Sequence, residues 1–279
     1  MAKTFFEKEI ILRKTSKYRR FALAFAAAAL FGAQTAMAAP MTLTTGDKVT
    51  LGYGAGANGD QWGGGEFLVS GVAGMVAQGV GDSFFTFCLE YSEHFSPGSQ
   101  YFVRINTGAV NGGLSNLGTY AGDPNGTAGF DPMSKATAWL FTQFMTDASS
   151  LGYDMSGGKN QANAVNQSRN DAFQLALWKL EGELTGSGLT TYNNINDATG
   201  TQARNWVAAA IAGSSSWTDT GNVRAMNLYT GYNAQTGVFS GASQDQLYMA
   251  PVPEPVSLAL LGIGLAGLGF AKRRKQNAA

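Results

Sequence analysis

Cysteine and histidine are almost missing from the sequence. Cys88 is the only cysteine and His94 the only histidine among the 279 residues. A single cysteine cannot form a disulfide within the chain, and one Cys with one His supplies too few of the ligands that a zinc site needs. If the strand around Cys88 continued, His94 would lie about 20 Å away, although a turn at Ser92 and Glu93 would shorten this. We therefore expect neither zinc nor a Cys-His hydrolase.

Positive charge is scarce outside the two ends. The chain holds 19 Lys and Arg and 19 Asp and Glu, but eleven of the basic residues lie before Pro40 or after Pro255. Between these two prolines eight basic and 17 acidic residues remain, a net charge of −9. Binding to nucleic acid needs clustered cations, which this region lacks, so we expect no nucleic-acid partner. The excess of acid favours solubility.

Each end of the chain carries one short apolar run. The first covers residues 21–31, about 11 residues, well short of the roughly 20 that span hydrocarbon. It is followed by Ala36-Met37-Ala38, small side chains of the kind that a signal peptidase recognises. We therefore expect a secretory signal peptide over residues 1–39, removed by signal peptidase after Ala38 or Ala39. Its basic region comprises Lys3, Lys8, Arg13, Lys14, Lys17, Arg19 and Arg20.

The second apolar run, residues 256–271, lies between two marked segments. Val252-Pro253-Glu254-Pro255 precedes it and Lys272-Arg273-Arg274-Lys275 follows it. As a helix its residues cover about 24 Å, barely enough for a bilayer. By the positive-inside rule the basic residues stay in the cytoplasm, so the chain before the run lies outside. We expect a transmembrane helix that anchors the precursor.

The tail at residues 251–279 resembles the PEP-CTERM sorting signal of Gram-negative bacteria. That signal consists of a Pro-Glu-Pro motif, a short apolar helix and a basic terminus, in the order found here. The resemblance implies cleavage near Glu254 by an exosortase, a membrane protease, with release or transfer to the cell surface. It also implies a cell that makes an extracellular polysaccharide or biofilm matrix, so polysaccharides or surface proteins are the expected partners.

The region between the two ends, residues 40–250, has the composition of one extracellular domain with many turns. It is rich in Gly, Asn, Ser and Thr, with aromatic residues in short bursts. A long irregular loop is expected at residues 106–133. Strand-like segments occur before this loop and again near the end of the region, at 41–51, 66–72, 82–91, 100–106, 223–230, 238–240 and 246–250.

Helical patterns lie between these two groups of strands. Ser134 is a suitable N-cap for a helix over residues 135–149. A second helix is expected over residues 161–184, and a shorter third over 202–212. The order predicts an α+β domain with a mainly antiparallel sheet and a two-helix or three-helix middle segment.

Cys88 lies in a stretch whose residues alternate in character. In a strand, Phe87 and Leu89 would share one apolar face, while Cys88 would lie on the other with Thr86 and Glu90. This placement argues against Cys88 as simple core filler. An unpaired thiol in an exported protein needs another role.

Gln174 and Trp178 are four residues apart, so they share one face of the second predicted helix, separate from its apolar stripe. The pair Phe87-Cys88, together with the Gln-x-Ala-aliphatic-Trp pattern from Gln174 to Trp178, resembles the thioester domains of Gram-positive surface adhesins. In that family an aromatic-Cys pair on a strand and a Gln on a later helix form an internal bond. The Thr that often precedes the Gln is Phe173 here.

The resemblance implies a thioester between Cys88 and Gln174. A thiolate held against a carboxamide can displace ammonia, and the product can capture an amine or hydroxyl on a neighbouring surface. Phe87 and Trp178 would keep water from the bond. The expected function is adhesion at the surface or in the matrix. A noncovalent structural or carbohydrate-binding matrix protein stays open as the alternative.

Other polar groups give weaker signals. Asp123, Asn125 and Asp131 lie in a Gly-rich loop that could hold calcium, but the spacing of an EF-hand is absent. Glu181 and Glu183 are two residues apart on a helix and so point in different directions, unlike a glycosidase pair. We expect no enzyme, no cofactor and no metal.

Overall fold

The computed structural model describes residues 43–54, 65–71, 83–110, 129–156 and 164–250. All of them belong to one compact unit, Pro40–Ala279. The expected signal peptide at residues 1–39 and the expected membrane helix at 256–271 lie outside these ranges. Within them, no helix combines the length and the apolar character needed to cross a membrane.

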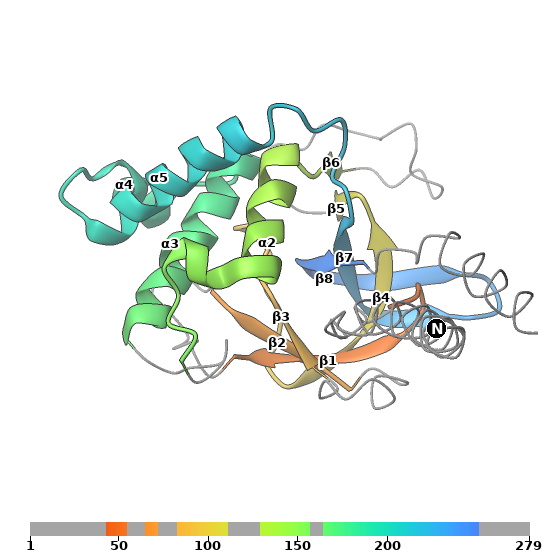
Figure 1. Ribbon diagram of the computed structural model, residues 1–279. Helices are drawn as coiled ribbons and strands as arrows, with labels where there is room; N and C mark the ends of the chain where they lie inside the picture. Colours follow the sequence, from red (N-terminus) through yellow and green to blue (C-terminus); the bar gives the residue numbers. More distant parts are fainter. Residues whose placement is uncertain (1–42, 55–64, 72–82, 111–128, 157–163, 251–279) are drawn as a thin grey trace, which may run out of the picture. The chain divides into compact units, whose positions relative to one another are not determined.

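The described strands form two antiparallel sheets (Figure 1). The larger has six strands in the order β3-β2-β1-β4-β7-β8, and the smaller consists of β5 and β6. The mainly antiparallel sheet expected from the sequence is confirmed. The strands of the larger sheet are β1 Lys48–Tyr53, β2 Phe67–Ser70, β3 Ser83–Thr86, β4 Ser99–Asn106, β7 Val223–Asn233 and β8 Val238–Met249. Those of the smaller sheet are β5 Gly108–Val110 and β6 Phe130–Pro132.

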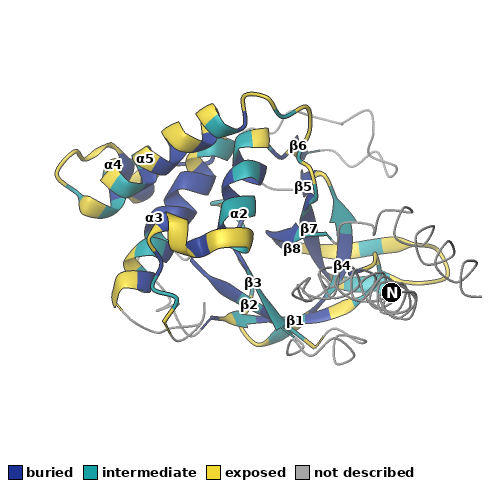
Figure 2. Cartoon of the chain, in the orientation of Figure 1, coloured by how far each residue is buried: buried dark blue, intermediate teal, exposed yellow. Residues whose placement is uncertain are grey.

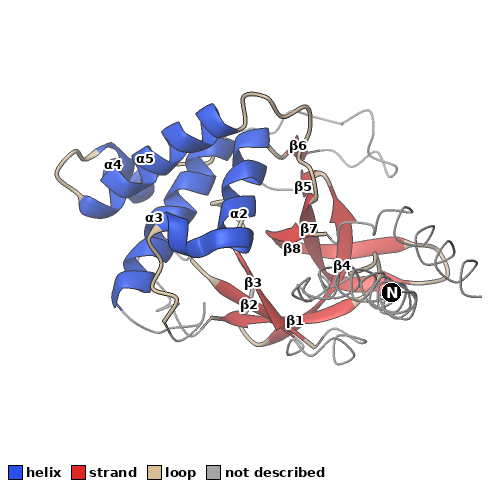
Figure 3. Cartoon of the chain, viewed as in Figure 1, coloured by secondary structure: helices blue, strands red, loops and turns tan. Residues whose placement is uncertain are grey.

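Four α-helices lie between β6 and β7 in the described part of the chain, so the expected number of two or three is wrong. The α+β class itself is confirmed. Figure 3 shows the helices grouped beside the strands, and α2 packs against β7 and β8. The helices are α2 Lys135–Asp147, α3 Ala164–Glu181, α4 Gly186–Asn193 and α5 Ala198–Gly213, and a short 3₁₀ helix, Ala148–Leu151, follows α2.

The ends of the helices follow local sequence signals. Ser134 caps α2 as expected, since its side chain accepts a hydrogen bond from the N–H of Thr137 at 3.0 Å. Asp197 caps α5 in the same way by accepting from Gly200, so this helix begins earlier than the expected residue 202. After α3, Gly182 adopts a positive φ of 81°, a common way to end a helix.

The missed helix, α4, has a sequence that disfavours helix formation. It contains two glycines and two threonines, Gly-Ser-Gly-Leu-Thr-Thr-Tyr-Asn. Packing compensates for this, because Tyr192 is buried and a Cβ at Gly188 would lie 3.3 Å from Leu184 and 3.5 Å from Tyr91. Gly188 therefore allows a close approach that a larger residue would hinder.

One expected loop and three expected strands differ in the structure. The segment expected to be an irregular loop at 106–133 begins and ends in the β5–β6 ladder. The expected strands at 238–240 and 246–250 are parts of one strand, β8, in which Gly241 has φ +67°. The strand expected over 82–91 ends at Thr86.

The core lies between the helices and the larger sheet, where buried residues from both meet (Figure 2). Aromatic rings occupy its centre. Phe87 lies edge-on to Phe144 of α2, with ring centroids 5.1 Å apart, and 4.6 Å from the centroid of Phe173 of α3. Edge-to-face and tilted contacts of this kind add to the burial of apolar area. The segment that contains Cys88 is thus fixed by packing against two helices.

Candidate functional site

Cys88 lies where the two edge strands of the larger sheet meet. Just after β3, it forms an isolated antiparallel bridge with Gln246 of β8. The N–H of Leu89 donates to the carbonyl of Asp245 at 3.0 Å, and the N–H of Leu247 donates to the carbonyl of Phe87 at 2.9 Å. These bonds join segments 158 residues apart in the sequence.

The expectation that Cys88 lies apart from the apolar face is wrong. Cys88 is 0 % exposed, and its neighbours Phe87 and Leu89 are buried as well. The alternation argument fails because the regular strand ends at Thr86. Both sides of this segment are covered, so the thiol lies inside the core.

Gln174 of α3 reaches this segment with its side-chain amide. The N–H of Cys88 donates to Gln174 Oε1 at 3.0 Å, and Gln174 Nε2 donates to the carbonyl of Cys88 at 2.9 Å. The amide thus pairs with the backbone of Cys88 as a neighbouring strand would. Gln174 is 1 % exposed. The structure therefore brings together the two residues that the sequence singled out.

The carbonyl oxygen of Gln174 receives two backbone donors. Besides Cys88, the N–H of Gly65 donates to Oε1 at 3.4 Å, a longer contact. Two N–H groups on one carbonyl oxygen can stabilise the negative charge that develops there when a nucleophile adds to the carbon. Without any reaction, the same two hydrogen bonds also satisfy the buried carbonyl oxygen of Gln174.

Gln246 donates to the sulfur itself. Its Nε2 lies 3.5 Å from Cys88 Sγ, within reach of a hydrogen bond to sulfur. Such a donor favours the thiolate, which is the nucleophilic form. Sequence reasoning missed this residue. The available signal was the polar run Gln244-Asp245-Gln246 in a strand, all three of which are buried.

Phe87 and Trp178, the expected shielding residues, are both buried. Trp178 lies one helical turn after Gln174 and meets the ring of Tyr91 edge-on, with centroids 4.9 Å apart. The sequence placed Gln174 and Trp178 on a face separate from an apolar stripe. In the structure that separation does not hold, because every residue from Ala172 to Trp178 is buried.

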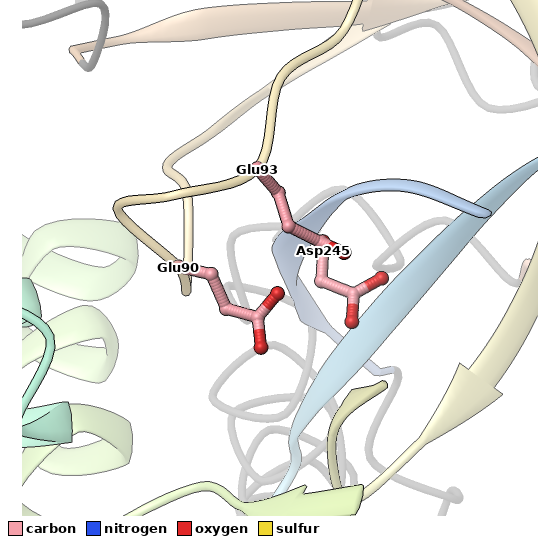
Figure 4. Close-up of side chains that lie close together, drawn as sticks. All are labelled: Glu90, Glu93 and Asp245. Atoms are coloured by element: carbon pink, nitrogen blue, oxygen red, sulfur yellow. The ribbon is translucent and has the colours of Figure 1, made fainter. Parts of the chain in front are cut away.

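A group of carboxylates lies beside this site (Figure 4). Glu90 and Glu93 follow Cys88 in the chain, and Asp245 precedes Gln246. One carboxylate oxygen from each lies within 4.8 Å of the others. Oxygen atoms gathered in this way are suitable ligands for a hard divalent cation. No metal was expected from the sequence, and these three residues were not among the expected site residues.

The other polar candidates have separate surroundings. His94 is exposed, whereas Cys88 lies in the core. Burial raises the pKa of Asp131 to about 6, with a smaller contribution from Glu183. Asp123 and Asn125, which the sequence grouped with Asp131, lie outside the described residues.

Glu181 and Glu183 point to different places, as expected. Glu181 accepts hydrogen bonds from the N–H of Ser134 at 3.1 Å and from the hydroxyl of Thr137. Glu183 is fully buried, and its charge raises the pKa of Glu90. The two carboxylates therefore do not face a common substrate position.

One comparison with known proteins gives a match. Residues 251–275 match the family model of the PEP-CTERM protein-sorting motif. The match contains Val252, Pro253, Glu254 and Pro255 and the basic residues Lys272, Arg273, Arg274 and Lys275, all outside the residues that the structure describes. Neither the curated proteins nor the solved structures contain a match to the chain.

The motif establishes how the protein is handled by the cell. It marks an exported protein that is anchored in the membrane before an exosortase processes it. The match ends at the tail, and the chemistry of the central domain has to be argued from the side chains around Cys88.

Proposed function

We propose that this exosortase substrate attaches to other components of the cell surface or matrix through an internal thioester between Cys88 and Gln174. The observation that carries the proposal is the contact between the two residues: the carboxamide of Gln174 is held against the backbone of Cys88, the residue that carries the thiol, by hydrogen bonds of 2.9 and 3.0 Å. Removal of the signal peptide by signal peptidase and cleavage at the sorting motif leave this domain outside the cell.

The bond forms by attack of the Cys88 sulfur on the carbonyl carbon of Gln174. The new S–C bond replaces the C–N bond, the proton of the thiol passes to the departing nitrogen, and ammonia leaves. Gln246 stabilises the thiolate, while the N–H groups of Cys88 and Gly65 stabilise the negative oxygen of the intermediate. Holding the two groups together replaces a collision in solution and lowers the barrier.

Burial protects the product from hydrolysis. Phe87 and Trp178 cover the site together with the surrounding core, so water has little access to the bond. An amine or hydroxyl on another surface that reaches the bond forms an amide or ester with Gln174 and releases the Cys88 thiol. Capture requires opening of the segment that contains Cys88, and each molecule can react once.

The intact mass of the exported protein tests the proposal. We expect a mass lower than that calculated by one ammonia, and no reaction of Cys88 with an alkylating reagent. Methylamine should convert the thioester to the methylamide of Gln174, one CH₂ heavier than the calculated mass, and release the thiol. Cys88→Ala and Gln174→Ala should each show their full calculated mass. Gln202→Ala is a matched control, because Gln202 is hydrogen-bonded to Arg169 away from this site and its loss should leave the deficit unchanged.

A noncovalent structural or carbohydrate-binding module is the second candidate. It is favoured by the way in which Gln174 satisfies both backbone groups of Cys88 without any reaction. In that case Gln174 serves as a link between α3 and the segment after β3. The full calculated mass, with a thiol that alkylates once the protein is unfolded, would discard the thioester and leave this candidate.

A further inference from the structure

Three carboxylates converge where the segment after β3 pairs with β8 and so closes the larger sheet. Glu90 and Glu93 come from the segment after β3, and Asp245 comes from β8. Figure 4 shows the side chains of Glu90, Glu93 and Asp245 gathered close together, with Glu93 beside Asp245. One oxygen of each lies within 4.8 Å of the other two.

Glu90 and Asp245 are buried, and three of their four carboxylate oxygens lack a donor among the described residues. Glu90 is 1 % exposed, and no hydrogen-bond donor in the described ranges reaches either of its carboxylate oxygens. Asp245 is 0 % exposed; its Oδ2 accepts from the N–H of Val110 at 2.6 Å, while its Oδ1 has no donor among the same residues. Leaving a buried carboxylate without compensation is costly.

Asn227 lies beside Asp245. It is fully buried, its Nδ2 donates to the carbonyl of Gly108 at 3.0 Å, and its side chain is also hydrogen-bonded to Asp245. Asp245 is therefore partly compensated by neighbouring donors, whereas both oxygens of the buried Glu90 lack a donor among the described residues. A buried carboxylate in this position, facing two others, suits a cation.

The surrounding charges do not neutralise the group. Burial raises the pKa of Glu90 most, and the carboxylates of Asp245, Glu93 and Glu183 raise it further. Burial and the charge of Glu93 likewise raise the pKa of Asp245. Burial raises the pKa of Glu93 as well, and the interaction with His94 opposes this only in part. The negative charge of this buried group has to be neutralised by a proton or a cation.

We propose that Glu90, Glu93 and Asp245 bind a calcium ion. The donors are all oxygen, which disfavours zinc, a metal bound mainly through nitrogen and sulfur. Calcium accepts carboxylate oxygens in a flexible geometry, whereas magnesium demands near-ideal octahedral geometry and usually keeps several waters. A buried group of three protein carboxylates therefore favours calcium.

The ion would join two segments distant in the sequence. Glu90 and Glu93 belong to the segment that contains Cys88, and Asp245 belongs to the strand that contains Gln246. Calcium therefore stabilises the closure of the sheet beside the Cys88–Gln174 contact. The site does not depend on whether a thioester forms, since none of its ligands takes part in that reaction.

Calcium binding to the full chain, purified in detergent and stripped of metal with EDTA, tests the proposal. Titration calorimetry with CaCl₂ should show one ion per chain. At a hundredfold excess over the Kd we expect the Tm to rise by about 5–10 °C. MgCl₂ should bind at least about tenfold more weakly.

Variants distinguish calcium binding at this group from nonspecific binding to other acidic residues. Glu90→Gln and Asp245→Asn should each abolish the rise in Tm. Glu93→Gln, at a partly exposed position where folding is less at risk, should weaken calcium binding at least about tenfold. Glu181→Gln removes a carboxylate outside the group and should bind calcium like the wild type. A proton shared between Glu90 and Glu93 is the rival arrangement; a wild-type Tm that does not respond to CaCl₂ would support it and overturn the calcium site.

Discussion

Gln246 is the residue whose replacement best separates reactivity from stability. Its Nε2 donates to the sulfur of Cys88, while its Oε1 is buried without a donor among the described residues. In Gln246→Met both polar atoms disappear at similar volume. Because an unsatisfied buried oxygen costs about 1–3 kcal/mol, we expect the free energy of unfolding to be unchanged or to rise. The fraction of exported protein with the ammonia deficit should fall, as measured by intact mass.

Gln244→Met provides the matched control for this prediction. Gln244 lies two residues earlier on the same strand and is also buried, but its Nε2 donates to the carbonyl of Glu90 instead of to the sulfur. The ammonia deficit should persist in this variant. An equal loss of the deficit in both variants would show that Gln246 acts through the strand as a whole, contrary to our expectation.

The candidate site could be predicted from the sequence only in part. Cys88 and Gln174 were found because a rare residue type and a short motif marked them. For Gln246 and Asp245 the sequence offers only the polar run Gln244-Asp245-Gln246, which does not reveal their role, since that role depends on a bridge between segments 158 residues apart. The acidic group was missed for the same reason. Its members belong to no sequence motif, and only the pairing of β8 with the segment after β3 brings them together.

At the level of the elements, Glu181 joins the start of α2 to the end of α3. It accepts from the N–H of Ser134 and from the hydroxyl of Thr137. Burial nevertheless raises the pKa of Glu181 to about 7, and the charge of Asp131 adds to this. The folded state therefore binds this proton more tightly than the unfolded state. Its contribution to stability is complete below about pH 4.5 and is lost as the pH rises through about 7.

Glu181→Gln tests this dependence because glutamine resembles the protonated acid. In EDTA at pH 8 we expect the variant to be more stable than the wild type by about 1–2 kcal/mol. Near pH 4.5 the difference should vanish. Urea denaturation over this range measures both free energies of unfolding. Parallel pH profiles of the two proteins would contradict the assignment, because the wild type would then lack the extra proton uptake.

The elements that the sequence predicted well are those with strong local signals. The cap at Ser134 and the long apolar helix around Phe173 are examples. The missed α4 depends on tertiary packing around Gly188, which outweighs the poor helix propensity of its sequence. The strand expected around Cys88 ends early because its second part leaves β2 and pairs with β8 instead. Neither outcome has a signature in the local pattern.

For the whole molecule, closure of the sheet links stability to the two proposed sites. In the sheet order β3 and β8 are the edges, yet the hydroxyl of Thr86 donates to the carbonyl of Leu247 at 2.6 Å and Cys88 bridges Gln246. Exposed strand edges favour aggregation, and this closure pairs part of them. Both the thiol and the acidic group lie at this seam, so an event that opens it would expose the thioester and remove the calcium ligands together.

The sorting motif gives the prediction for the complete chain. Glu254→Ala should prevent cleavage by the exosortase, so the apolar run at 256–271 and the basic residues behind it keep the precursor in the membrane. Immunoblots of membrane and medium fractions should show the protein moving from the medium or cell surface to the membrane.

A truncation after Ala250 separates sorting from folding. It preserves β8, including the hydrogen bond from the N–H of Ala250 to the carbonyl of Asn222 at 2.8 Å, but removes the anchor. We expect the truncated chain to leave the membrane without the exosortase, and to do so even when it also carries Cys88→Ala. Normal release of Glu254→Ala would show that the motif is dispensable, whereas retention of the truncated chain would show that the central domain itself holds the protein at the membrane.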